Sequence, residues 1–213
     1  MNRVKHTKVM SALGLVAALS CTSAMADSSR ELHASYPYEG QKLVLDVGVG
    51  ETVVIASDEQ AIRVEVKVES EKSGWFSWHE TDIDGITLEA DNRSGKLVLS
   101  LSEQDDVKQT WRVYVPKETA VDIDLGVGEI NVEGLASNLT IDVGVGSVQV
   151  KHNHTYQDID LDAGVGEVAL YENGQMLDAK RTLVSQSYRA HHAGNGALNV
   201  SVGVGEVTIH QTN

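Results

Sequence analysis

The chain has 213 residues, a formal net charge of −14, 5% aromatic residues and a single cysteine. An acidic surface of this kind repels nucleic acids and anionic membranes, and it attracts metal cations or basic partners. Because one cysteine cannot form a disulfide within the chain, stability has to come from buried apolar side chains and backbone hydrogen bonds. At this length we expect one domain.

Residues 1–26 have the features of a secretory signal peptide. A basic start is followed by a short apolar run and by the small-residue cleavage site Ala24-Met25-Ala26. The apolar run is shorter than the roughly 20 residues that a membrane-spanning helix needs. We therefore expect an exported protein of the periplasm or cell surface, with a mature domain at residues 27–213 that contains no transmembrane segment.

A lipid anchor on Cys21 is the competing interpretation of the same segment. The sequence Ala18-Leu19-Ser20-Cys21 loosely resembles the site at which bacterial lipoproteins are cut and acylated. The residue three before the cysteine is alanine instead of leucine, and the Ala-Met-Ala site is good. Cleavage after Ala26 is therefore the favoured expectation.

The first half of the mature chain contains strand patterns at irregular spacing. Apolar residues alternate with polar ones around Ile62–Val68, Ile86–Leu88, Leu97–Leu101 and Trp111–Val115, with turn-rich segments between them. Because the spacing is loose, we expect this half to form a sandwich-like cap on a more regular second half.

Three aromatic residues lie close together in this half, in the segment "SGWFSWHE". Trp75, Phe76 and Trp78 follow a glycine and are surrounded by polar residues, which indicates a loop or hairpin tip. Such a tip is a candidate contact for a protein or glycan partner. The alternative is that the cluster folds back and covers an exposed end of the core.

One six-residue motif occurs five times. It begins at Asp46, Asp124, Asp142, Asp162 and Ser201, each time close to the sequence DVGVGE. The intervals of 78, 18, 20 and 39 residues fit a single period of 19–20 residues, with the motif absent from some copies. A period of this size is typical of a solenoid.

The residues around the motif predict two strands joined at a corner. Val121, Ile123, Leu125 and Val127 alternate with polar or glycine residues, and the alternation resumes at Ile130 after a shift of one position. A bend at the glycines would keep both apolar sets pointing inward, because glycine accepts unusual backbone angles and close approach of neighbours. We expect these corners to stack on one another.

Residues 171–196 interrupt the repeat. This segment is polar and carries Lys180, Arg181, Arg189, His191 and His192, and residues 174–180 are the best candidate for a short helix. We expect a surface loop whose cations lie against the acidic residues of the repeat; an anion or partner site is the alternative.

The stretch "WRVYVPKETAVDIDLGVGEINVEGLASNLTIDVGVGSVQV", residues 111–150, resembles the bacterial putative-adhesin families of toast-rack-like β-strand repeats. Their pattern is a strand ending in Val-Pro, an alternating apolar strand, a glycine-containing corner, an acidic residue and a Val/Ile strand. Many members carry Asn-Gly-Asp at the corner, where this chain has Gly-Val-Gly-Glu. The resemblance implies an all-β parallel solenoid, export and no established chemistry.

Stacked corners would place acidic residues in rows. Asp124, Asp142 and Asp162 would share one row with Ser201, and rows of this kind keep a β protein soluble. The sharper hypothesis is weak Ca²⁺ binding by these three carboxylates, since hard cations prefer several carboxylate oxygens. No other cofactor is expected.

The sequence contains no recognisable catalytic motif. His152 and His154 have the spacing of residues on one face of a strand, but no further ligand completes a zinc site locally, and solvated histidines are the favoured interpretation. The leading hypothesis is an exported, non-enzymatic scaffold or adhesin-like binding protein of the cell envelope. The alternatives are a carbohydrate-active β-helix enzyme and a Ca²⁺-stabilised acidic repeat protein.

Overall fold

The computed structural model describes residues 29–70, 82–177, 179–181 and 184–212. These residues form one sheet of thirteen strands and contain no helix. The strands are β1 (Ser29–Pro37), β2 (Lys42–Ser57), β3 (Ala61–Ser70), β4 (Leu88–Arg93), β5 (Lys96–Leu101), β6 (Val107–Pro116), β7 (Val121–Glu133), β8 (Leu139–His152), β9 (Asp158–Glu172), β10 (Gln175–Leu177), β11 (Lys180–Arg181), β12 (Gln186–His191) and β13 (Ala197–Gln211).

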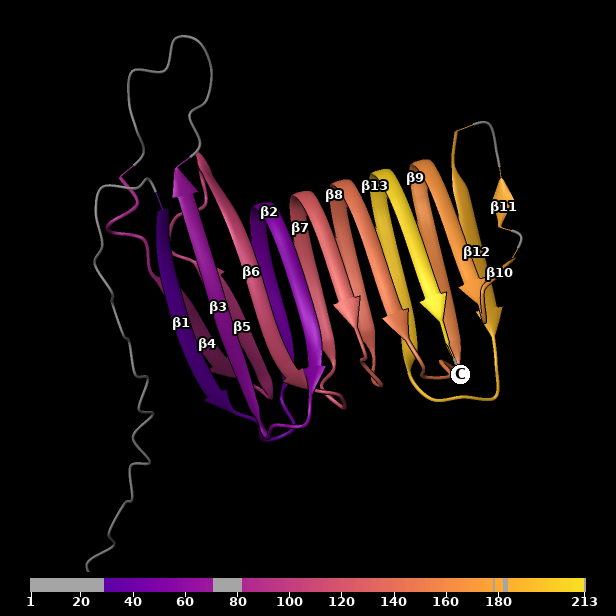
Figure 1. Cartoon of the computed structure of the whole chain (residues 1–213), viewed down its shortest axis with the longest axis horizontal. Helices are drawn as coiled ribbons and strands as arrows, with labels where there is room; N and C mark the ends of the chain where they lie inside the picture. Colours follow the sequence, from indigo (N-terminus) through magenta and orange to yellow (C-terminus); the bar gives the residue numbers. More distant parts are fainter. Residues whose placement is uncertain (1–28, 71–81, 178, 182–183, 213) are drawn as a thin grey trace, which may run out of the picture.

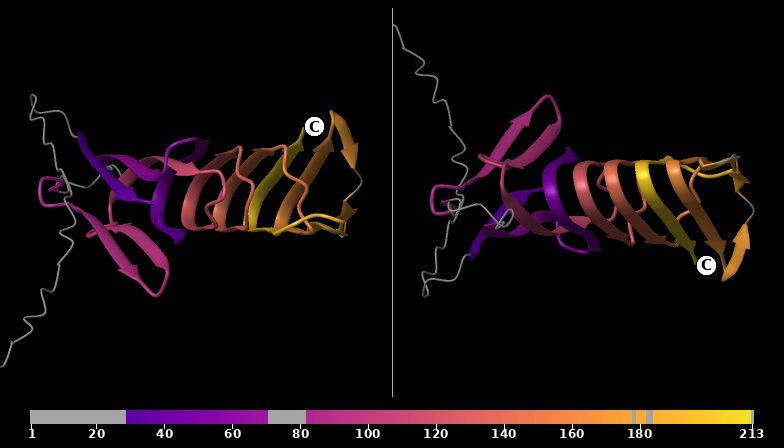
Figure 2. Two further views of the ribbon diagram at one scale, coloured as in Figure 1. Left: turned by 90° about the horizontal axis from the view of Figure 1, so that it is seen from below. Right: turned by 90° about the horizontal axis from the view of Figure 1, so that it is seen from above.

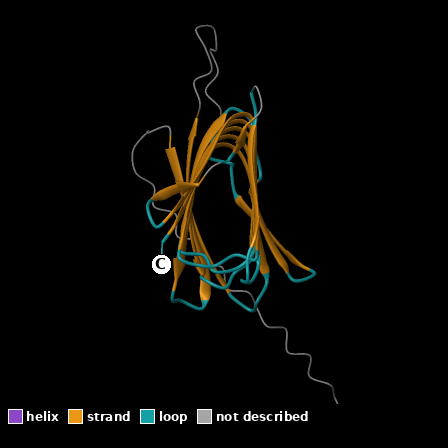
Figure 3. Cartoon of the chain, turned by 90° about the vertical axis from the view of Figure 1, so that its right-hand side faces the viewer, coloured by secondary structure: helices purple, strands orange, loops and turns teal. Residues whose placement is uncertain are grey.

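The five strands that carry the glycine motif form the regular part of the molecule (Figure 1). β2, β7, β8, β13 and β9 run parallel, and their motifs pair in register, so that Gly50, Gly128, Gly146, Gly205 and Gly166 lie side by side. Each strand bends at its motif and continues into a second wall, as the end view shows (Figure 3). The prediction of stacked glycine corners in an all-β solenoid is therefore confirmed.

The order of these strands differs from their order in the chain. The sheet order is β2-β7-β8-β13-β9, so the last strand of the chain lies between β8 and β9 and is parallel to both (Figure 1). The connection from β8 to β9 therefore passes over a gap one strand wide, and the C-terminal strand fills it.

The N-terminal half is less regular than the half that carries the stacked motifs, as expected. β5 pairs with the first half of β2 and β6 with the second half, so β5 and β6 together make one further coil without the glycine motif. β3 and β1 then extend the wall of β6 in antiparallel order, while β4 extends the wall of β5. Figure 2 shows these two extensions diverging from each other.

Short antiparallel strands cover the other end of the sheet. β12 pairs with the first half of β9, β10 pairs with its second half, and β11 pairs with β12. The helix expected at residues 174–180 is wrong. Asn173 and Gly174 have positive φ angles of 49° and 81°, and they close a tight turn that reverses the chain from β9 into β10.

The core lies between the two walls. Buried Leu, Ile and Val side chains from both halves of every bent strand fill it, for example Leu125 and Ile130 of β7, which are 0% and 1% exposed. Full burial of such a side chain contributes about 1.5–3 kcal/mol. Trp111 of β6 is the largest fully buried side chain of the core among the described residues. No helix in the described part of the chain is long and apolar enough to cross a membrane.

Two predicted features lie outside the described residues. The leader with Cys21 falls within residues 1–28, and the aromatic tip of Trp75, Phe76 and Trp78 falls within residues 71–81. The predictions made for both segments stay predictions.

Candidate functional site

The glycines of the motif allow the backbones of neighbouring coils to approach closely. The second glycine of each motif has a φ between 144° and 151°, a region that is essentially restricted to glycine. A Cβ atom on Gly146 would lie 1.7 Å from the carbonyl oxygen of Gly128, and one on Gly144 would lie 2.6 Å from that of Gly126. No side chain fits at either position, so the corners form a continuous ladder of glycines.

The valine between the two glycines points outward. Val127, Val145, Val204 and Val165 are 45–49% exposed, and Val49 of β2 is half-buried. The expectation that Val127 belongs to the inward set is therefore wrong. The bend at residues 126–129 carries this segment around the outside of the core, and burial resumes only at Ile130. We call the four exposed valines the valine ridge.

A row of acidic residues runs along each side of the valine ridge. Before the corner, the register aligns Asp46, Asp124, Asp142, Ser201 and Asp162 in that order. After the corner, it aligns Glu51, Glu129, Ser147, Glu206 and Glu167. The predicted acidic rows are thus present, and the insertion of β13 puts the neutral Ser201 between Asp142 and Asp162.

The charges in the first row interact. Partial burial, followed by the negative charges of Asp124 and Asp122, raises the pKa of the Asp142 carboxyl. Neighbouring parallel strands lie about 4.8 Å apart, and two like charges at about that distance repel by about 1 kcal/mol in water. Asp162 lies two strands away from Asp142, so the three carboxylates predicted to hold Ca²⁺ do not converge.

Among the described residues, no group of three or more His, Cys, Asp or Glu side chains is arranged to hold a metal ion. The calcium hypothesis remains a prediction. A melting temperature that rises by several degrees in Ca²⁺ and falls back in chelator would support it, and an unchanged melt would remove it.

Cations lie against a second set of acidic residues, on the wall before the corner. Lys42 forms an ion pair with Asp122. At the other end of the sheet, Arg189 Nε lies 2.9 Å from Asp160 Oδ2, and His191 Nδ1 lies 2.7 Å from Asp158 Oδ1. The interruption at residues 171–196 thus places two of its basic side chains beside acidic residues of the repeat, as expected.

Glutamine side chains lie at both ends of the glycine ladder. At the N-terminal end, Gln104 packs over Gly48 and accepts a hydrogen bond from Gln109 Nε2, and Gln109 Oε1 accepts one from Trp111 Nε1. At the other end, Gln186 Oε1 accepts a hydrogen bond from Val168 N at 3.1 Å. The amide of Gln186 thus occupies a backbone position of β9 to which a further strand would otherwise bind.

His152, the last residue of β8, and His154, which follows it, are packed into the protein. His152 is 3% exposed, and its Nδ1 donates to the carbonyl oxygen of His154, whose own ring nitrogen contacts Asn195 O. Both rings pack edge-on against Tyr156, with centroids 4.9 and 4.8 Å away. Burial lowers the pKa of His152. The expectation of solvated histidines is therefore wrong for His152.

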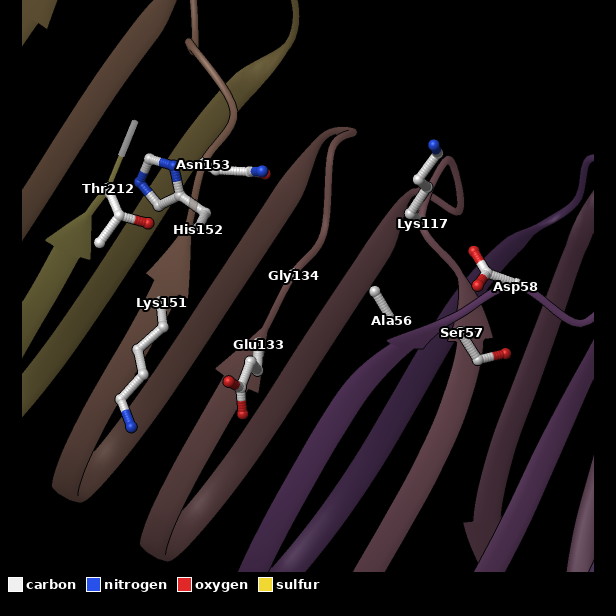
Figure 4. A pocket seen from close by; sticks show the side chains of 10 residues that line it. All are labelled: Ala56, Ser57, Asp58, Lys117, Glu133, Gly134, Lys151, His152, Asn153 and Thr212. Carbon is white, nitrogen blue, oxygen red and sulfur yellow. The ribbon is translucent and has the colours of Figure 1, made fainter.

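An open pocket of about 380 Å³ lies beside His152, at the ends of the second wall. Figure 4 shows Asp58, Lys117, Glu133 and Lys151 around it, each on a different strand or loop. The positive and negative side chains are mixed, and the one imidazole at the rim has its Nδ1 bonded to backbone. This geometry provides mixed charges at a surface hollow and no assembled nucleophile and base.

The match to a known protein family extends over most of the chain. Residues 40–212 match the family model described as Toastrack DUF4097, a range that includes all five bent strands and every other strand except the edge strand β1. The chain belongs to the Toastrack family. No curated protein matches this Toastrack chain.

Solved structures resemble the Toastrack chain at low identity. A putative cell adhesion protein from Clostridium sporogenes is 15% identical, with a TM-score of 0.48 over 86% of this chain and 99% of the other. A putative adhesin from Parabacteroides merdae is 8% identical, with a TM-score of 0.28 over 86% and 96%. One from Bacteroides fragilis is 10% identical, with a TM-score of 0.24 over 84% and 97%.

Proposed function

We propose that this Toastrack protein is an exported, non-enzymatic scaffold of the cell envelope that binds a partner in the manner of an adhesin. The observation that carries the proposal is the valine ridge, because it is the exposed apolar feature that the repeat presents in register on four coils. The three similar solved structures described above are named as adhesion proteins, which agrees with this role. The signal-like leader supports export.

The partner that fits the ridge is a protein segment with apolar and cationic side chains. The valines offer an apolar strip, and the glycines beside them leave it unobstructed. The acidic rows on both sides attract positive charge and repel negative charge. The acidic rows of two copies would repel each other if their ridges met. We therefore propose a cationic partner.

Binding to defined peptides tests this proposal. We expect an alternating Val-Lys peptide to bind the mature protein in a salt-sensitive manner, and alternating Val-Glu and Ser-Lys peptides to bind much more weakly. The double variant Val145→Ser, Val204→Ser should lose most of the Val-Lys binding. Val53→Ser, on the wall of β2, is the matched control. Equal binding of all three peptides, or no loss in the ridge variant, would refute the assignment.

Export is tested separately. Expression of the full chain in a bacterial host should give a product that begins at Asp27 by mass spectrometry and fractionates with the cell envelope. A product that keeps residues 1–26 in the cytoplasm would contradict export, and a product acylated on Cys21 would establish the lipid-anchored alternative.

A further inference from the structure

The C-terminal strand β13 occupies a position that the rest of the chain leaves open. β8 and β9 are consecutive in sequence, yet in the sheet they are separated by one strand width, and β13 fills this slot by pairing in parallel with both. Its side chains Leu198, Val200, Val202, Val207 and Ile209 are 0–2% exposed, so the slot is part of the hydrophobic core. β8 and β9 can present a complete core only when a fifteen-residue strand lies between them.

The slot accepts a strand with the glycine motif, and the chain contains several such strands. Both neighbours of β13 align with it over thirteen or more positions, with valine opposite valine and glycine opposite glycine at the corner. The contacts that hold β13 are backbone hydrogen bonds and repeated aliphatic pairs, and neither depends on which copy of the chain supplies the strand. A β13 from a second molecule would form the same contacts.

The connection to β13 is a short crossing segment. β12 lies on the far side of β9, so residues 192–196 have to cross the β8–β9 connection to reach the slot. The two connections are held together by hydrogen bonds, including Asn195 N to Thr155 O at 3.1 Å and Gln157 N to Gly196 O at 2.9 Å. A Cβ on Gly194 would lie 2.2 Å from Thr155 O, so the crossing is tight. Short, constrained hinges of this kind favour exchange of an element between copies.

We propose that β13 is an exchangeable strand: the slot between β8 and β9 of one molecule accepts β13 of a second copy, and the two copies form a strand-swapped dimer. In the swapped dimer, every contact of β13 is kept and only the hinge at residues 192–196 changes its path. Because β13 is held on both sides, exchange takes place while the chain folds, before the slot is closed. The dimer fraction therefore depends on protein concentration during folding.

Disulfide trapping tests the proposal in the full chain carrying Cys21→Ser. Gln149 of β8 and Thr208 of β13 are partners in the parallel ladder, and both are half-exposed on the outer face. Their Cα atoms lie at the usual interstrand spacing of about 4.8 Å, within the range that a disulfide can bridge. One chain carries Gln149→Cys, a differently tagged chain carries Thr208→Cys, and the two are unfolded, mixed, refolded and oxidised.

We expect a disulfide-linked heterodimer whose yield rises with the total protein concentration during refolding. The matched control is the pair Asn131→Cys and Gln149→Cys on separate chains, which are ladder partners in β7 and β8, two strands that are not exchanged. The exchange pair should give several-fold more heterodimer than the control pair. Equal yields from both pairs at every concentration would mean random collision and would overturn the proposal.

A double variant provides a second readout. A single chain with both Gln149→Cys and Thr208→Cys, refolded and oxidised at high dilution, should close on itself and run as a monomer. When this oxidised monomer is unfolded without reductant and refolded at high concentration, it should again give a monomer, whereas the cysteine-free chain refolded at the same concentration should give a dimer with the same circular dichroism spectrum. A cysteine-free chain that refolds as a monomer at every concentration would refute the exchange.

Discussion

Three residues at each corner have three different roles. The first glycine leaves room for the carbonyl of the neighbouring coil, the second takes a backbone conformation that other residues avoid, and the valine between them lies outside the bend. The sequence predicted the need for glycine because two glycines interrupt a regular alternation at the same phase in every copy. It did not predict the exposed valine, because alternation counted from Leu125 places Val127 inside.

Alanine at the second glycine of a corner should be strongly destabilising. Gly146→Ala combines a φ of 151° with a Cβ 1.7 Å from a backbone oxygen, and the two effects together should cost about 3 kcal/mol or more. Urea unfolding of the purified mature protein measures this loss. Gly85→Ala is the control, because a Cβ there has no neighbour within 4 Å, and it should change the free energy of unfolding by less than about 1 kcal/mol. Similar losses of unfolding free energy in both variants would contradict the close backbone approach in the glycine ladder.

The buried imidazole of His152 should make the protein less stable in acid. Since burial lowers the pKa of His152 from its ordinary value of 6.5, the unfolded chain takes up a proton at a higher pH than the folded chain. This contribution to stability is present above pH 6.5 and is lost as the pH falls below it. Thermal melts between pH 8 and pH 5 should show the decline.

His152→Asn should flatten this pH dependence, because asparagine can keep the hydrogen bond to the carbonyl of His154 and does not titrate. His192→Asn, at an exposed position, should leave it unchanged. If His152→Asn melts with the same pH dependence as the native chain, another group is responsible.

At the scale of strands, the sequence predicted phase and register well. Each motif strand has the same apolar positions on both sides of its glycines, and the structure pairs these positions without offset. The order of the strands in the sheet could not be predicted from the positions of their apolar residues, because any of the five motif strands would pair equally well with any other. The place of β13 depends instead on the connections around β9, which carry no periodic signal.

The same register creates repulsion that one substitution should relieve. Asp142 lies next to Asp124 in the first acidic row, and partial burial, followed by the charges of Asp124 and Asp122, raises the pKa of its carboxyl, so the charged form is less favourable in the folded protein than in the unfolded chain. Asp142→Asn should therefore raise the free energy of unfolding at pH 7 by roughly a few tenths of a kcal/mol, because water screens charges at this exposed position, and the part of the gain that comes from repulsion should shrink in 1 M salt. Chemical denaturation at low and high salt measures both effects.

Asp162→Asn is the matched control for this gain. The register neighbours of Asp162 are Ser201 and Ser187, and Arg189 lies close enough to interact with its charge. Neutralising Asp162 should leave stability unchanged or slightly reduced. A gain of the same size at both positions would mean that net charge, and not the neighbour in the row, determines the effect.

At the scale of the whole molecule, the core is continuous from the N-terminal extensions to the cap formed by β12. The sequence predicted one all-β domain with a regular second half and a looser first half, since the spacing of apolar runs changes near residue 116. It could not predict the buried packing of His152 on Tyr156, because His152 has a polar side chain at the end of a strand and Tyr156 belongs to the irregular connection from β8 to β9.

Removal of β13 should affect the whole fold. A chain that ends at Gly196 leaves the core open between β8 and β9, and we expect it to lose its cooperative thermal transition or to aggregate. A chain without β1, which is an edge strand, should still unfold cooperatively at a lower temperature. Calorimetry of both truncated proteins makes the comparison. A cooperative transition in the chain lacking β13 would show that β8 and β9 can pair directly.

The strands at the two ends of the glycine ladder also prevent the addition of further coils. Identical coils in perfect register are a template for unlimited growth, since each added coil offers the next one the same surface. β5 and β6, which lack the glycine motif, cover β2 at one end, and the antiparallel β12 and β10 cover β9 at the other, so neither end offers a further coil the surface of a motif strand. The protein therefore keeps the geometry of a fibril segment while remaining a particle of fixed size.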